Sequence, residues 1–305
     1  MPRRKISLWM VVLTVASSAL AFALAAQDFG TAPVSVKVLV TVTSKVQAPP
    51  PEVPKDAVSI RLDGQSLPVE DWESASQDGS PLALIIDVDD YLEASFGGAL
   101  EDIRPFIRAL PPDALVEVAY SGVILQPFTT VHEAAAEAIR MPLGPAALPV
   151  DCSSGGRPCA SPGICDGLTE LEKHWPAEAE RREVLFIGEG GYCAGNPDFA
   201  DLIDRSHRQG VSIFTIYATG RGRGCLQTVS DETGGEALIG LPSTAPLKPY
   251  LDQLSTDLRN QYFLTFEAVG GYKIFTSKLQ VNAKLPDIVV HAPIHVDVPA
   301  SPAEP

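Results

Sequence analysis

The sequence predicts an α/β fold: a doubly wound, mostly parallel sheet with helices on both faces, inserted in a small discontinuous β domain. Residues 82–87 read Leu-Ala-Leu-Ile-Ile-Asp, and this continuous apolar run ending at Asp87 is typical of a strand buried on both faces of a parallel sheet. From there to residue 259, strand-length apolar runs alternate with segments whose apolar residues recur at helical spacing. Period-two patterns flank this region, so we expect the N- and C-terminal strands to pair in one β domain.

The first 25 residues have the pattern of a signal peptide. Arg3, Arg4 and Lys5 precede an apolar run over 6–24, and Ala23-Leu24-Ala25 gives a small-x-small cleavage motif. We expect cleavage and a secreted or periplasmic protein. The alternative is a membrane anchor formed by the uncleaved segment, because the apolar run approaches the length that spans a bilayer.

Residues 33–78 are expected to supply the N-terminal strands of the flanking β domain. Residues 34–43 alternate with period two, and a proline-rich connector follows at 49–54. Residues 57–62 are the next predicted strand. Asp63-Gly64 is a hairpin turn signal, so we expect 66–72 to be the returning strand.

The α/β domain is expected over residues 80–259. After the strand at 82–87, a helical stripe runs from Phe96 to Ile107, although Pro105 conflicts with a continuous helix. Residues 114–120 and 123–128 flank Ser121-Gly122 and predict an antiparallel hairpin at the edge of the sheet.

Further helices and strands complete this predicted domain. Thr130 and Glu133 form a capping-box pattern that opens a helix ending near Arg140. Ser161-Pro162 is an N-terminal signal for the helix that follows the loop at 142–162. Later strands are expected at 184–187, 211–218 and 237–239, and later helices at 164–175, 197–210, 225–233 and 251–258.

The β character returns after the last predicted helix. Strands are expected at 262–268, 273–283, 288–291 and 294–298. Residues 260–298 therefore complete the flanking β domain, and 299–305 form a tail that we expect to be disordered.

The five cysteines point to disulfides in an exported chain. Their spacing lacks the close pairs and nearby histidines of a zinc site. One thiol should remain unpaired, and the sequence does not fix the pairing. The cysteines are Cys152, Cys159, Cys165, Cys193 and Cys225.

Composition and motifs exclude several classes of function. The chain has 38 acidic and 23 basic residues and a formal charge of −15, which disfavours nucleic-acid binding. The glycines at 220–224 have the wrong spacing for a dinucleotide or phosphate loop. His132-Glu133 lacks a second histidine at helical spacing, and no G-x-S-x-G nucleophile motif occurs. We therefore expect a protein that is not an enzyme.

The order of predicted elements resembles the von Willebrand factor A domain. More specifically, the chain is similar to a family of secreted acidobacterial proteins described as von Willebrand factor A-related. The resemblance runs from about residue 34 to 299, and its most specific parts are Arg181-Arg-Glu-Val and Asn260-Gln-Tyr. Other matching stretches are Asp63-Gly64, Leu84–Asp87, Trp175-Pro176, Asp231–Glu236 and Val296 with Val298.

The resemblance implies a metal-ion-dependent adhesion site, and in this chain that site is degenerate. Asp87 stands at the first ligand of the Asp-x-Ser-x-Ser loop, but Asp89 and Tyr91 replace the two serines. Glu189 stands where the family has aspartate, and the threonine position falls near Ser161 or Pro162. Two alternatives follow.

In the first alternative, Asp87, Asp89 and Glu189, together with Asp90, hold a divalent cation such as Ca²⁺ or Mg²⁺. In the second, no metal binds and the acids are solvated around the strand end.

The resulting hypothesis is an exported interaction or adhesion-like module that uses the strand-end loops of its A-like domain. Its partner would be a protein or another component of the cell envelope. A membrane would be involved only if the N-terminal segment is retained. The alternative is a structural envelope scaffold without a metal or ligand site. The oligomeric state is not predicted.

Overall fold

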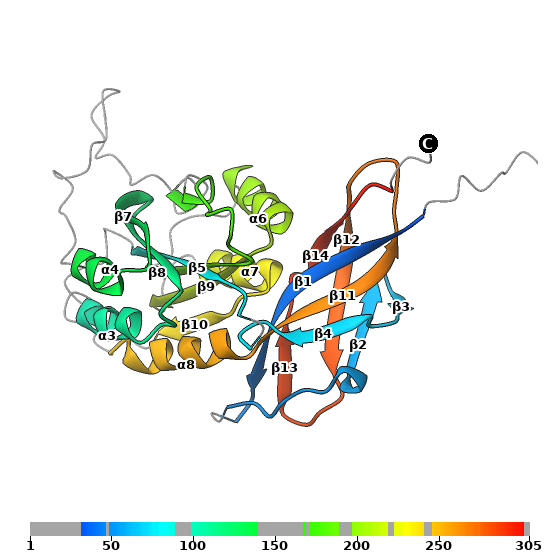
Figure 1. The fold of residues 1–305 in the computed structure, drawn as a ribbon, viewed down its shortest axis with the longest axis horizontal. Coiled ribbons are helices and arrows are strands. Elements are labelled where there is room, and N and C mark those ends of the chain that lie inside the picture. Colours follow the sequence, from blue (N-terminus) through cyan, green and yellow to red (C-terminus); the bar gives the residue numbers. More distant parts are fainter. Residues whose placement is uncertain are drawn as a thin grey trace, which may run out of the picture.

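Two packed units make up the described part of the computed structural model (Figure 1). One is a β unit built from strands near the two ends of the chain. The other is an α/β unit, built from the middle of the chain, with helices around one six-stranded sheet. The structure describes residues 32–46, 49–77, 79–88, 99–139, 167–168, 171–188, 197–218, 223–240 and 246–301.

The α/β unit contains a six-stranded sheet in the order β10-β9-β8-β5-β6-β7. Counted along the chain from β5, this is the 3-2-1-4-5-6 arrangement of doubly wound sheets. Neighbours are parallel except for β7, which is antiparallel to β6 at one edge. The predicted doubly wound sheet with an antiparallel edge is confirmed. Its strands are β5 (Leu82–Val88), β6 (Leu115–Tyr120), β7 (Val123–Thr129), β8 (Arg181–Gly188), β9 (Val211–Ala218) and β10 (Ala237–Gly240).

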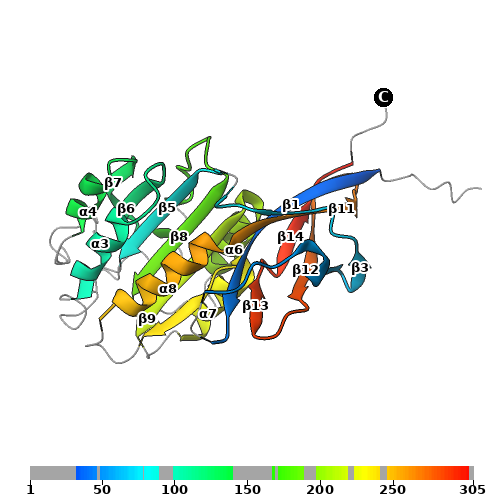
Figure 2. The same ribbon diagram turned by 60° about the horizontal axis from the view of Figure 1, so that its bottom comes forward.

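Helices cover both faces of this sheet, and alternate residues of β5 contact the two layers. Leu84 and Ile86 pack with α3 (Ile103–Arg108), α4 (His132–Ala138) and α8 (Lys248–Arg259). Ile85 packs on the opposite face with α6 (Pro197–Gln209), α7 (Arg223–Thr233) and the helical residues around Leu168. Figure 2 shows α3 and α8 together on the near face. Every residue of β5 is buried, as the unbroken apolar run predicts.

The β unit is a sandwich of two four-stranded sheets, ordered β13-β1-β11-β4 and β14-β12-β2-β3. β1 lies between β11 and β13, so strands from the two ends of the chain pair directly (Figure 1). Alternate residues such as Val36, Phe266 and Ile60 form the core between the sheets. Its strands are β1 (Pro33–Ser44), β2 (Val58–Leu62), β3 (Gln65–Leu67), β4 (Asp71–Ser74), β11 (Gln261–Val269), β12 (Phe275–Ala283), β13 (Ile288–His291) and β14 (His295–Val298).

The single strand expected at 66–72 is wrong, because the structure divides it between the two sheets. β3 pairs with β2 after the turn at Asp63-Gly64, whereas β4 pairs with β11. Pro68 follows β3 and has no N–H to continue the ladder. The chain therefore leaves the first sheet and crosses to the second.

The conflict at Pro105 is resolved by where the helix begins. A 3-10 turn, η2 (Ala99–Asp102), precedes α3, so Pro105 is the third residue of α3. The first N–H groups of a helix have no partner within it, and a proline there removes no helical hydrogen bond.

The expected capping box at Thr130 and Glu133 is also wrong. α4 begins after Val131, and no side chain caps it. The hydroxyl of Thr129 accepts the Val131 N–H at 3.0 Å. Glu133 instead forms an ion pair with Arg108 at 2.6 Å, because α3 and α4 pack side by side. α4 ends at Ala138, before the predicted Arg140.

The two most specific stretches of the resemblance meet where the units join. Arg181 begins β8 and donates from Nε to Oε1 of Gln261 at 3.0 Å and from Nη2 to the Leu258 carbonyl. The Gln261 amide donates to Glu183 Oε1 at 2.7 Å and to Thr41 Oγ1 at 3.2 Å. All four polar side chains are buried. The network links the first strand, the central sheet and β11.

Several predictions concern residues outside the described ranges. These are the signal peptide at 1–25, the Ser161-Pro162 start, most of the tail, and Cys152, Cys159, Cys165 and Cys193. The disulfide and cleavage predictions therefore stay predictions. Among the described helices, none has the length and apolarity to cross a membrane.

Candidate functional site

Asp87 lies at the carboxyl end of β5, beside the point where the strand order reverses between β5 and β8. Ligands of open α/β sheets bind outside the carboxyl ends of strands at this position. Asp87 is only 1% exposed. Its Oδ1 accepts the backbone N–H of Gly122 at 3.1 Å, and the next carbonyl, from Val88, accepts the N–H of Ser121 at 2.9 Å. The β6–β7 turn is therefore fastened to the end of β5.

Glu117 is a second buried carboxyl on the same face, and sequence reasoning missed it. It lies on β6 opposite Ile85, while Asp87 lies opposite Ala119, so the two acids are diagonal neighbours. Glu117 is 2% exposed, and its Oε1 has no hydrogen-bond partner in the described part of the chain. Burial, and then the nearby Asp87 carboxylate, raise the pKa of Glu117 to about 7.

A close glycine contact covers this acidic pair. Gly122 has a φ of +80°, and a Cβ placed there would lie 2.3 Å from the Cα of Gly167. The backbone of the β6–β7 turn therefore touches the helical residue Gly167, which lies next to Leu168 and close in sequence to Leu171. Those two leucines are fully buried and pack in the same cluster as Ile85 and Ala119. Asp87 and Glu117 are thus enclosed from this side.

The other predicted ligands, Asp89 and Glu189, lie outside the described residues, as does Asp90. The residues that precede them end neighbouring strands, because Val88 of β5 pairs in register with Ile187 of β8. The structure places Asp87 at the predicted strand end, and the assembly of the three-residue ligand set stays a prediction.

The donor set that is described does not complete a metal site. Asp87 and Glu117 offer the hard carboxylate oxygens that Ca²⁺ and Mg²⁺ prefer, but such ions need about six to eight ligands. Within the described ranges, no group of three or more His, Cys, Asp or Glu side chains could hold a metal ion. A cation at this edge would depend on the loops that follow β5 and β8.

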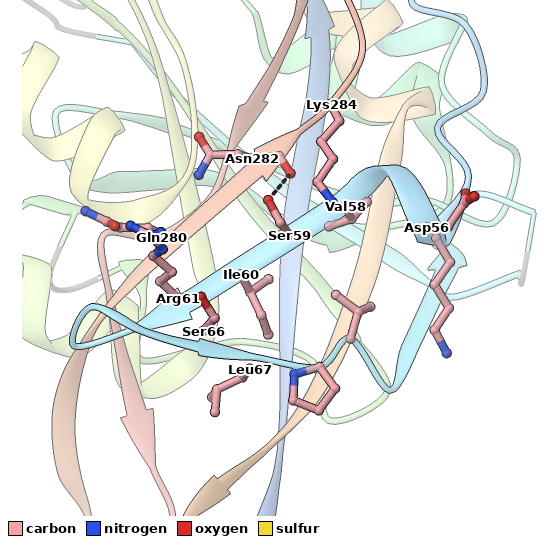
Figure 3. A pocket seen from close by; sticks show the side chains of 13 residues that line it. Asp56, Val58, Ser59, Ile60, Arg61, Ser66, Leu67, Gln280, Asn282 and Lys284 are labelled. Atoms are coloured by element: carbon pink, nitrogen blue, oxygen red, sulfur yellow. Dashed lines mark hydrogen bonds between the residues drawn. The ribbon is translucent and has the colours of Figure 1, made fainter.

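Two cavities lie away from this strand end. The first, of about 1090 Å³, lies on the β sandwich against β2 and β12. Figure 3 shows Ser59, Arg61, Gln280 and Asn282 gathered above Ile60 and Leu67. The second, of about 620 Å³, lies between the sandwich and the α/β unit. Neither cavity is lined by Asp87 or Glu117.

Comparison with known proteins gives similarity to solved structures only. No protein-family model and no curated protein matches the sequence. BatB from Bacteroides thetaiotaomicron is 13% identical with a TM-score of 0.43, over 57% of this chain and 97% of that one. The SpRpn10 VWA domain is 16% identical with a TM-score of 0.41, over 58% and 97%.

A von Willebrand factor type A protein from Catenulispora acidiphila is 12% identical with a TM-score of 0.41. That match covers 88% of this chain and 75% of the other. At such low TM-scores none of these similarities supports a statement about function. The fold assignment rests on this chain's own strand order and the helices on both faces of its sheet.

Proposed function

We propose that this chain is an exported, non-enzymatic interaction module that binds a protein partner at the carboxyl edge of its central sheet. The observation that carries the proposal is the buried pair of Asp87 and Glu117 at the topological switch point. Burying two carboxyls together costs free energy, and Glu117 has no compensating partner at Oε1 in the described residues. Such costly, perturbed acids are characteristic of functional sites.

Enclosure of the pair favours a binding or switching role over catalysis. A general acid or base must reach a substrate atom directly or through one water. Asp87 and Glu117 are 1% and 2% exposed, and neither lines the cavities described above. Instead, the Asp87 carboxylate fixes the β6–β7 turn through Gly122, so its negative charge helps to hold the loops that a partner would contact.

The test compares two isosteric charge removals at opposite edges of the same sheet. Asp87→Asn retains an Oδ1 acceptor for Gly122, and Asp113→Asn removes an exposed charge just before β6, at the amino edge. Each variant is immobilised beside the wild type, and bound proteins from the native envelope and culture fractions are quantified. We expect one protein to be enriched by wild type and Asp113→Asn and lost with Asp87→Asn. Equal enrichment by all three chains would favour the scaffold alternative.

A cation held by Asp87, Asp89 and Glu189 remains a separate prediction of the sequence. Calorimetric titration of the purified chain with Ca²⁺, Mg²⁺ and Mn²⁺ tests it. If a site exists, Asp87→Asn should abolish the binding heat, because it removes the first carboxylate ligand. An absence of binding by wild type to all three ions would remove the metal and leave the partner surface to be tested by the capture experiment.

A further inference from the structure

One edge of β1 is open over the first half of the strand. The N–H of Gly270 bonds to the Ala32 carbonyl, and the N–H of Val42 bonds to the Asn260 carbonyl. The antiparallel register between β1 and β11 is unbroken between these two bonds, so even-numbered residues direct their backbone groups toward β11. The odd-numbered residues direct theirs to the other edge. There β13 pairs only with residues 41–44. No described strand pairs with Ser35, Lys37 and Leu39 on this side.

The edge stays open because the chain leaves the sheet after His291. Pro293 follows and cannot donate to a ladder. The next N–H, that of Ile294, bonds to the Glu232 carbonyl of α7 at 3.1 Å. The chain then enters β14, which pairs with β12 in the opposite sheet. An edge of this kind is a template for another strand.

The cavity of about 620 Å³ between the two units, called the cleft below, lies along this open edge. β1 residues 36–39 form one wall, and β14 with the chain before it forms another. Residues 206–212, from the end of α6 to the start of β9, close the side toward the α/β unit. The volume falls within the range of about 300–1,000 Å³ that is typical of ligand pockets.

The two sides of the cleft differ in chemistry. Toward the sandwich core it is lined by the apolar side chains of Val36, Val38 and Val296. Toward the α/β unit it is lined by Lys37, Arg182 and Arg208, with Glu180 and Asp297 as the acidic members.

Two polar atoms in that second wall are buried without a hydrogen-bond partner in the described residues. They are Arg182 Nε and Gln209 Oε1. Arg182 Nη1 does donate to the Gln209 carbonyl, at 2.9 Å, so the guanidinium is held in place. Lys37 and Glu180 are 3.4 Å apart and about half exposed, which makes their pairing weak. Three cationic side chains thus line the cleft against two acidic ones, in a chain whose formal charge is −15.

We infer that the cleft binds an extended peptide segment of a partner protein, which adds a strand to β1 over residues 35–39. Side chains of an added strand alternate between two faces. One set would contact Val36, Val38 and Val296, and the other would face Lys37, Arg182 and Arg208. The matching peptide alternates apolar and acidic residues. Asp87 does not line this cleft, so the peptide-binding inference does not depend on the proposed function.

The probe is a fluorescein-labelled heptapeptide of alternating valine and glutamate, and fluorescence anisotropy with the full chain measures binding. We expect saturable binding by the wild type. Arg208→Glu should weaken it at least tenfold, because it reverses an exposed charge at the cleft. Arg61→Glu makes the same change at the other cavity and should alter the affinity less than twofold. Matching circular dichroism spectra confirm that both variants are folded.

Peptide N-methylation tests strand addition without altering the protein. In one peptide the valine amides are methylated, and in the other the glutamate amides are. Only one set points at β1 in an added strand, so only one methylated peptide should lose binding. Equal binding by both peptides, equal loss with both, or no saturable binding by the unmodified peptide would overturn the inference. A concentration-dependent dimer in sedimentation, without peptide binding, would assign the edge to a second copy and also overturn it.

Discussion

Glu117 and Asp87 show what a single sequence does and does not reveal about individual residues. Asp87 could be identified through the resemblance, because it directly follows an apolar run and stands at the first ligand position of the adhesion-site loop. Glu117 could not, because one acid in a short strand usually faces solvent, and its burial depends on tertiary packing over the face that carries Ile85 and Ala119. The one available signal was its position between the buried Val116 and Val118. Asp89 and Glu189 stay predictions.

Gly122 and Gly64 provide a residue-scale test of the contact above Asp87. Both have positive φ, +80° and +82°, so alanine at either position pays about 1 kcal/mol for the left-handed conformation. A Cβ at Gly64 has nothing within 4 Å, whereas one at Gly122 meets Gly167. Denaturant unfolding should give about 1 kcal/mol for Gly64→Ala and about 2 kcal/mol or more beyond that for Gly122→Ala. Equal losses would show that the turn and Gly167 do not touch.

At the scale of elements, the buried strands and amphipathic helices were predictable because their patterns are strong. Leu251, Leu254 and Leu258 bury one stripe of α8 as the helical spacing predicts. Errors occurred where a local motif competed with a tertiary contact. Glu133 matched a capping box, but Arg108 on the adjacent helix α3 pairs with it instead. The division of 66–72 into β3 and β4 likewise depends on a distant partner, β11.

The start of α4 can be tested with two neighbouring threonines. Thr129→Val removes the hydroxyl that accepts the Val131 N–H and should cost about 1 kcal/mol of unfolding free energy. Thr130→Val removes the hydroxyl of the expected box, which makes no cap in the structure, and should change stability by less than about 0.5 kcal/mol. Urea unfolding of both variants measures the difference. A larger loss of unfolding free energy for Thr130→Val than for Thr129→Val would show that Thr130 does cap the helix.

For the whole molecule, the pairing of terminal strands followed from period-two patterns at both ends, but the joint between the units did not. Arg181 and Glu183 of β8 lie 80 and 78 residues from Gln261 in the sequence, and they meet it only because β11 begins beside β8. Glu183, the buried acid at that joint, makes the free energy of unfolding depend on pH. Burial raises the pKa of Glu183 to about 8, against an ordinary value of 4.5, despite the nearby Arg181.

This shift predicts how stability depends on pH. Between about pH 4.5 and pH 8 the folded chain keeps a proton on Glu183 that the unfolded chain releases, so its contribution is full below that window and lost as pH rises. Glu183→Gln cannot titrate and keeps an acceptor for Gln261. Its melting temperature should match wild type at pH 5 and exceed it by several degrees, about 5 °C, at pH 8.

Calorimetric melts of both chains at the two pH values provide the measurement. Buried Glu117, Glu172 and Asp257 also have raised pKa values, to about 7, 7 and 8, so the variant should keep a weaker fall with pH. His291 acts oppositely, because burial lowers its pKa and stability is lost as pH falls. An identical offset between variant and wild type at both pH values would show that Glu183 does not titrate in this window.

The central claim is that a partner binds at the carboxyl edge of the sheet, and site-specific photo-cross-linking in native cells tests it most directly. A photoreactive phenylalanine analogue at Ile124, an exposed residue just after the β6–β7 turn, samples that edge, and one at Asp113 samples the amino edge. We predict a discrete cross-linked protein from position 124, its loss when Asp87→Asn is added, and none from position 113. No adduct at 124, or the same adducts from both positions, would contradict the claim.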